Sequence, residues 1–177
     1  MSKGRSAYMK HGFFAFAMVF FAFAMAFSAC GVYSPYGAQT GGAKTFSVDF
    51  FKPQTPLASP ELAQNFTEEL RDLILRQSTL SLEERDGELQ FSGMVTGYQV
   101  TPVSVQSDEV ASLNRLTVTV KVKYVNTLDK SLNFDRSFTK FADFDAAEDL
   151  FSVEADLMDE INDQLTQEIF NASLGNW

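Results

Sequence analysis

A serine and a lysine three residues apart are the first pair in this sequence that could do chemistry. Ser137-Phe-Thr-Lys140 matches the S-x-x-K string of serine hydrolases that use a lysine. In those enzymes the spacing works because a helix brings both side chains to one face. Here the segment alternates as a strand does, and residues three apart in a strand point to opposite faces. We therefore interpret the match as chance.

Four acidic residues near position 145 could in principle bind calcium. Asp143, Asp145, Glu148 and Asp149 offer carboxylate oxygens, but the glycine and the terminal glutamate of an EF-hand loop are absent. Turn and helix capping explain these carboxylates more simply. The sequence predicts no metal site and no cofactor.

Cys30 is the residue with the clearest chemical setting. The chain begins with a cationic segment up to Lys10, continues with an almost purely apolar run from Phe13 to Phe27, and places Ser28 and Ala29 before the cysteine. This order is typical of a secretory signal peptide, and small residues directly before a cysteine form the lipobox of bacterial lipoproteins. We predict a signal peptide over residues 1–29 and lipidation of the Cys30 thiol. The alternative is a spanning helix followed by a buried cysteine, for which a run of about 15 apolar residues is short.

The residues after Cys30 indicate where the lipid anchor would hold the chain. Gly31 follows the cysteine, and no acid occurs before Asp49, so the familiar retention and surface-export signals of lipoproteins are not visible. We expect the periplasmic face of the outer membrane, where two or three acyl chains give firm attachment. Residues 30–43 are rich in glycine, proline and small polar residues and predict a flexible tether.

Composition excludes several classes of enzyme. Without its first 29 residues the chain has 11 bases and 23 acids, a formal charge of −12, with no histidine and one cysteine. Histidine-dependent catalysis and zinc sites built from His and Cys are therefore excluded. The acidic balance also argues against nonspecific binding to nucleic acid. The length suits one domain over residues 44–177.

Hydrophobic periodicity in the first half of that domain predicts a strand, a helix and a hairpin. Residues 44–51 alternate Phe46, Val48 and Phe50 against polar neighbours, until prolines stop the strand. Ser59-Pro60-Glu61 predicts the start of an amphipathic helix over residues 60–77. A strand beginning at Leu80 and Leu82 is then expected to turn back at Asp86-Gly87 and continue to Tyr98.

The second half predicts two more strands and a final helix. Residues 115–124 alternate most regularly, with one apolar face and one basic and hydroxylated face. A turn over 126–130, a strand over 132–142 and a helix capped by Asp145 and ending near Asn171 follow. This order predicts an α+β fold with two helices packed on one face of a mixed, mostly antiparallel sheet of four to five strands.

Several stretches, in this order behind a lipobox, resemble the LptE family of lipopolysaccharide-assembly lipoproteins. They are Cys30-Gly-Val-Tyr-Ser34 and the ranges 44–51, 91–98, 113–123 and 138–145, with the terminal Asn176-Trp177. The resemblance implies two helices on a sheet and no catalysis. It also implies a lipoprotein that sits inside the LptD β-barrel of the outer membrane, helps that barrel fold and helps deliver lipopolysaccharide to the outer leaflet. The alternative is a stand-alone lipoprotein that binds lipid or scaffolds the envelope.

Charge distribution suggests where lipopolysaccharide could bind. Residues 143–177 contain ten acids and no base, whereas six of the eleven bases lie between 115 and 140. Arg115, Lys121 and Lys123 alternate onto one face of a single strand and could donate charge-assisted hydrogen bonds to lipid A phosphates. The alternatives are solubility, pairing with acids across the sheet, and contact with the barrel wall.

Overall fold

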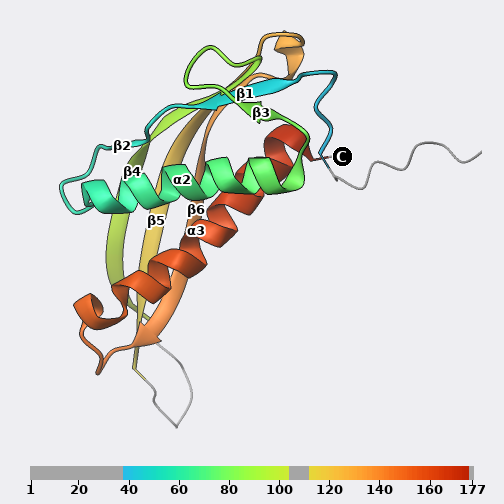
Figure 1. The fold of residues 1–177 in the computed structure, drawn as a ribbon. Helices are drawn as coiled ribbons and strands as arrows, with labels where there is room; N and C mark the ends of the chain where they lie inside the picture. The colour runs from blue at the N-terminus through green and yellow to red at the C-terminus, as the bar shows by residue number, and fades with distance from the viewer. Residues whose placement is uncertain (1–37, 104–111, 176–177) are drawn as a thin grey trace, which may run out of the picture. The chain divides into compact units, whose positions relative to one another are not determined.

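The computed structural model describes residues 38–103 and 112–175 (Figure 1). Cys30, the predicted signal peptide and most of the predicted tether lie outside these residues. Six strands and two α-helices follow one another as β1 (Thr45–Val48), β2 (Lys52–Pro53), α2 (Pro60–Gln77), β3 (Ser81–Leu82), β4 (Leu89–Val103), β5 (Leu113–Asn126), β6 (Phe134–Asp145) and α3 (Leu150–Leu174). A short 3-10 helix, η2 (Lys130–Leu132), separates β5 from β6.

The strands form one mixed sheet in the order β3-β1-β4-β5-β6, and β2 also pairs with β4. β1 runs parallel to β3 and to β4, and β2 runs parallel to β4. The long strands β4, β5 and β6 are antiparallel neighbours. The predicted α+β class is confirmed. The sheet has six strands where four to five were expected, because β2 is an additional two-residue strand.

Both helices cover the same face of the sheet, as predicted (Figure 1). Helix α2 begins as expected: the Ser59 hydroxyl accepts a hydrogen bond from the Leu62 amide at 3.1 Å, and Pro60 occupies the first turn. The bounds predicted from its capping residues, 60–77, are confirmed. The predicted apolar stripe is buried in full, and it consists of Leu62, Phe66, Leu70, Leu73 and Ile74.

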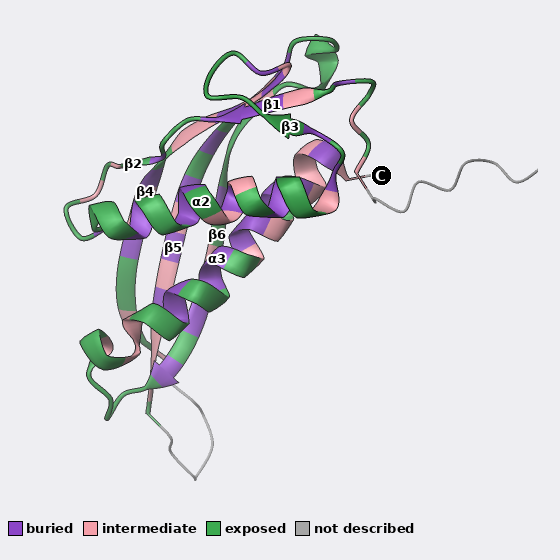
Figure 2. Ribbon diagram, in the orientation of Figure 1, coloured by how far each residue is buried: buried purple, intermediate pink, exposed green. Residues whose placement is uncertain are grey.

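The side chains of β5 alternate between the two faces of the sheet. Its alternate residues are at most 1% exposed on the helix side, and they are Leu116, Val118, Val120, Val122 and Tyr124. Figure 2 shows this alternation on the strands behind the helices. The opposite side chains, from Arg115 to Lys123, lie on a face that no helix covers among the described residues. We call this the open face.

The predicted hairpin around Asp86-Gly87 is wrong. β3 and β4 do not pair, because β1 lies between them; the amides of Ser81 and Glu83 donate to the carbonyls of Lys44 and Phe46. The returning loop passes so close to β1 that a side chain on Gly87 would overlap the Phe46 backbone. β1, α2 and β3 thus form a parallel unit in which the helix is the crossover.

The predicted cap of the last helix is also wrong. Asp145 ends β6, and its carboxylate accepts a hydrogen bond from the Ala147 amide at 2.8 Å in the turn that follows. The cap residue is Asp149, and the helix continues beyond Asn171 to Leu174. No helix in the described ranges is both long and apolar enough to cross a membrane.

Candidate anion-binding groove

The open face carries a groove with a volume of about 830 Å³. It lies over β4 and β5 and is bordered by the segment between β1 and β2 and by the loop before β4. Four bases and three acids line it, giving a local excess of positive charge in a chain that is acidic overall: Lys52, Arg85, Lys121 and Lys123, with Asp49, Asp86 and Asp135.

The structure places two of the three predicted ligand residues in this groove. Lys121 and Lys123 are both exposed, and they project from β5 into it. The ammonium group of Lys121 lies 3.2 Å from a carboxylate oxygen of Asp135 on β6, and both side chains are about half exposed. Lys123 forms no ion pair with the residues described, so its charge is available to a ligand.

Arg115 lies on the same face but outside the groove. Its guanidinium donates to both carboxylate oxygens of Asp143, at 2.7 and 2.8 Å, and stacks 3.7 Å above the ring of Phe141. Hydrogen bonds from Arg115 hold the pKa of the Asp143 carboxyl below its usual range. This geometry matches the cross-sheet pairing that was one alternative for the basic strand.

Lys52 and Arg85 also line the groove, and neither was predicted from the sequence. Each residue is an isolated base next to a predicted strand end or turn. Neither belongs to a run of alternating basic and apolar residues such as the one that contains Lys121 and Lys123. Arg85 in particular reaches the groove only because the loop after β3 passes β1, whereas the sequence predicted a hairpin. The signal that could have found it is the strand-helix-strand order over residues 44–82, which suits a parallel pair.

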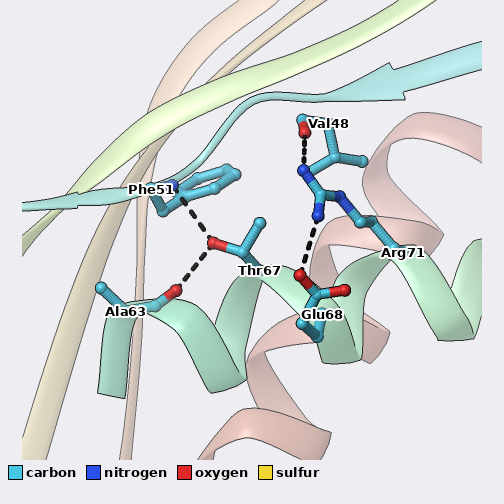
Figure 3. A network of polar contacts seen from close by, with 6 residues as sticks. All are labelled: Val48, Phe51, Ala63, Thr67, Glu68 and Arg71. Carbon is cyan, nitrogen blue, oxygen red and sulfur yellow. Dashed lines mark hydrogen bonds and ion pairs between the residues drawn. The ribbon is translucent and has the colours of Figure 1, made fainter. Parts of the chain in front are cut away.

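The groove edge is fixed to helix α2 by a polar network (Figure 3). The Thr67 hydroxyl accepts from the Phe51 amide at 3.1 Å and donates to the Ala63 carbonyl at 2.7 Å. Arg71 donates to the Val48 carbonyl at 2.6 Å and to Glu68 at 2.8 Å. These contacts hold the backbone on both sides of residues 49 and 50, which line the groove.

The same network explains why the predicted alternation over residues 44–51 breaks down. The strand was expected to bury Phe50, but Phe50 is 43% exposed in the groove wall and Phe51 is fully buried. The Phe51 ring occupies the space next to Gly93, which has no side chain, and meets Phe66 edge-on at 5.0 Å. The end of the pattern is therefore out of register by one residue.

Replacing Thr67 by valine is expected to destabilise the fold by about 1–3 kcal/mol, because the buried Phe51 amide loses its only acceptor. Urea unfolding followed by circular dichroism measures the change. Thr139→Val is the matched control, since Thr139 is exposed and its hydroxyl, 3.0 Å from that of Thr119, can be replaced by water. Equal stability losses in the two variants would contradict the role of this contact.

The groove offers binding groups: ammonium and guanidinium donors, the hydroxyl of Ser92, and an apolar wall that includes Phe50 and Met94. Lysine and arginine donors suit phosphate or carboxylate groups. Within residues 38–103 and 112–175, no three His, Cys, Asp or Glu side chains are arranged to hold a metal ion. The arrangement thus fits an anionic ligand that has apolar parts.

Comparisons with known proteins identify a family and a fold. The family model described as LptE, lipopolysaccharide-assembly, matches residues 43–173. No curated protein gives a match. A hypothetical protein from Chlamydia trachomatis is similar in structure, with 10% identity, a TM-score of 0.51, and coverage of 74% of this chain and 98% of its own. A protein from Xanthomonas campestris has 14% identity, a TM-score of 0.50, and coverage of 71% and 81%. At these identities the likeness shows a shared fold.

Proposed function

Because the chain belongs to the LptE lipopolysaccharide-assembly family, we propose that it is an outer-membrane lipoprotein that assists assembly of the LptD barrel and delivery of lipopolysaccharide to the outer leaflet. The family match over residues 43–173 is the observation that carries this proposal, since it spans nearly all the described residues. Anchoring through acyl chains on Cys30 and a position on the periplasmic side are parts of the same proposal. No enzymatic step is included.

The open face of the sheet supports a position inside a barrel. One face is sealed by α2 and α3, whereas the other presents hydroxyl and charged side chains, including Thr117, Thr119, Thr139 and Lys121. The interior of a large outer-membrane barrel is polar, and it often contains a plug. The hydroxyl and charged groups of this face can form hydrogen bonds to such a wall.

The groove supports contact with lipopolysaccharide. Lipid A phosphates are anionic, and the chain attracts anions only where its bases gather. Lys121 and Lys123 together with Lys52 and Arg85 provide such a place on the open face. Phosphate would accept charge-assisted hydrogen bonds from these groups, while Phe50 and Met94 provide apolar contact.

Copurification tests the barrel partner directly. The protein is tagged at its C-terminus, extracted in mild detergent and purified, and the masses of the recovered partners are measured. We expect a large β-barrel in stable complex. Depletion of the protein should lower the folded barrel and surface lipopolysaccharide together. Purification without any barrel, and an unchanged barrel level after depletion, would favour the stand-alone lipoprotein instead.

Neutralising the groove is expected to weaken lipopolysaccharide binding by about tenfold at low salt, because two exposed charges are lost and exposed contacts are screened. The variant is Lys121→Gln with Lys123→Gln; adding Lys52→Gln and Arg85→Gln should weaken binding further. Binding of purified protein is measured at two salt concentrations, with circular dichroism to confirm folding.

Arg115→Gln is the control on the same strand and face, and it separates the groove from the strand face as a whole. We expect it to bind as the parent does, because Arg115 does not line the groove and its guanidinium is held by both carboxylate oxygens of Asp143. A folded four-site variant that binds like the parent at both salt levels would refute the phosphate role. Loss of barrel copurification with unchanged binding would assign the groove to the barrel wall.

A further inference from the structure

Phe151, in the first turn of α3, is 86% exposed, more than any other large apolar side chain described. Single exposed apolar residues are common at protein surfaces and need no explanation by themselves. The surroundings of Phe151 distinguish it, because they combine a second exposed apolar residue with several exposed carboxylates and no nearby base in the sequence.

Hydrogen bonds place Phe151 at the end of the sheet where β4 finishes. The Tyr98 hydroxyl on β4 donates to Glu154 at 2.5 Å, and the Ala146 amide donates to the Ser112 carbonyl at 2.8 Å. Phe151 precedes Glu154 by about one helical turn, and Val100 follows Tyr98 by two residues. From the Tyr98–Glu154 contact, the helical turn back to Phe151 covers about 5 Å and the two strand residues on to Val100 cover about 7 Å. Val100, which is 38% exposed, therefore lies at the same end of the sheet as Phe151.

Helix α2 covers the side of α3 on which Phe151 lies, but only farther along the helix. Met158, Asn162 and Thr166 continue the stripe that begins at Phe151 and are at most 7% exposed. Asn162 shares a cleft with Asn65 of α2, which shows that this stripe faces α2 there. Phe151 precedes the covered part of the stripe.

The charges around Phe151 restrict what can cover it. Asp145, Glu148 and Asp149 are exposed just before the helix, and Asp156 is exposed within it, five residues after Phe151. No base follows Lys140 in the sequence. An anionic lipid surface would be repelled. A second copy docking through the same patch would place two such acidic ends together, which like-charge repulsion also opposes.

We propose that Phe151 and Val100, ringed by Glu148 and Asp149, form a docking surface for a protein pocket that is apolar at its centre and rimmed by lysine or arginine. The occupant is the β-barrel partner, so the inference rests on the proposed function. An aromatic anchor surrounded by charges that match the partner is the usual form of an interface hot spot. We call this the Phe151 surface.

Copurification of the barrel with tagged full-length variants tests the Phe151 surface. Phe151→Ala is expected to lower recovered barrel at least tenfold, a typical loss for a hot-spot aromatic. Phe151→Trp should retain most of it. Glu148→Gln with Asp149→Asn should lower recovery several-fold at low salt and less at high salt. Leu128→Ala is the matched control, because Leu128 is 54% exposed in the turn at the opposite end of β5.

The outcomes separate the inference from the function on which it rests. If the parent protein recovers no barrel, the proposed function fails and the inference with it. If the parent and Phe151→Ala recover equal barrel, only the Phe151 surface is refuted. Unchanged thermal unfolding of Phe151→Ala excludes a folding defect. If Phe151→Ala keeps the barrel but loses binding to phosphatidylglycerol vesicles, the inference is overturned in favour of a lipid surface. If it keeps the barrel but loses self-association in sedimentation, the inference is overturned in favour of a second copy.

Discussion

The change Cys30→Ala is expected to remove the protein from the outer-membrane fraction, leaving it uncleaved or soluble. In the proposed anchoring, a diacylglyceryl group is attached to the Cys30 thiol and cleavage of the signal peptide exposes the amine of the same residue. Alanine provides no thiol for this attachment. Each buried CH₂ of an acyl chain contributes about 0.8 kcal/mol to anchoring, so losing two or three chains removes the whole attachment. No other cysteine in the chain can replace Cys30.

Fractionation of the envelope and the mass of the purified protein measure this effect. The control is Ser28→Gly, which keeps a small residue at the same place before the cysteine and should be processed as the parent is. A Cys30→Ala protein of mature mass that remains in the outer-membrane fraction would show that the anchor lies elsewhere.

Gly93→Ala is expected to destabilise the domain by about 3 kcal/mol or more, at the upper end for overpacking a core. A Cβ at this position would overlap the Lys121 carbonyl oxygen and lie 2.6 Å from the Phe51 ring. The Phe51 backbone is held by the hydrogen bond from its amide to the Thr67 hydroxyl, and its buried ring packs against Phe66. The neighbouring residues 49, 50 and 52 line the groove. The substitution should therefore lower the unfolding temperature by roughly 10 °C and also weaken lipopolysaccharide binding.

Gly97→Ala provides the graded control on the same strand. Its Cβ would lie 3.0 Å from Cβ of Thr119 and 3.1 Å from the Thr119 hydroxyl, so it meets a side chain and not a carbonyl fixed in the sheet. We expect a loss of about 1 kcal/mol or less. The unfolding temperatures of the two variants are compared. Equal losses of stability would show that the close contact with the Lys121 carbonyl adds no cost at Gly93.

Elements with a long, regular pattern could be predicted from the sequence. Helix α2 combines a capping serine, an N-terminal proline and an apolar stripe, and its bounds follow from these signals. β5 alternates over its whole length because one face packs under two helices and the other is uncovered. In both elements each local preference agrees with the tertiary surroundings, so local information was sufficient.

The pairing of the short strands could not be predicted in the same way. Asp86-Gly87 is a good hairpin signal, and Asp86 has the positive φ of 57° that such turns use, yet the segment crosses to the other side of β1. The register change at Phe50 depends on Thr67 and Gly93, which are distant in sequence. Both errors concern the groove edge. The shared face of Lys121 and Lys123 could be predicted from alternation along one strand, whereas the place of Lys52 and Arg85 beside them depends on how β1 pairs.

The two ends of the described domain are joined, because the Gln39 amide donates to the Leu174 carbonyl at 2.7 Å. β1 is equally non-local, since both its strand partners lie more than 30 residues later in the chain. Pairing over such separations is slow, because loop closure must precede the contacts that compensate for it. Phe46 and Val48 are almost fully buried in the native sheet. Their strand lies between β3 and β4, so it is not flanked on both sides until β4 has been made. A chain that emerges N-terminus first must therefore keep its first strand apart from other chains until its later strands are in place, and the step most open to aggregation comes early, before the sheet can form.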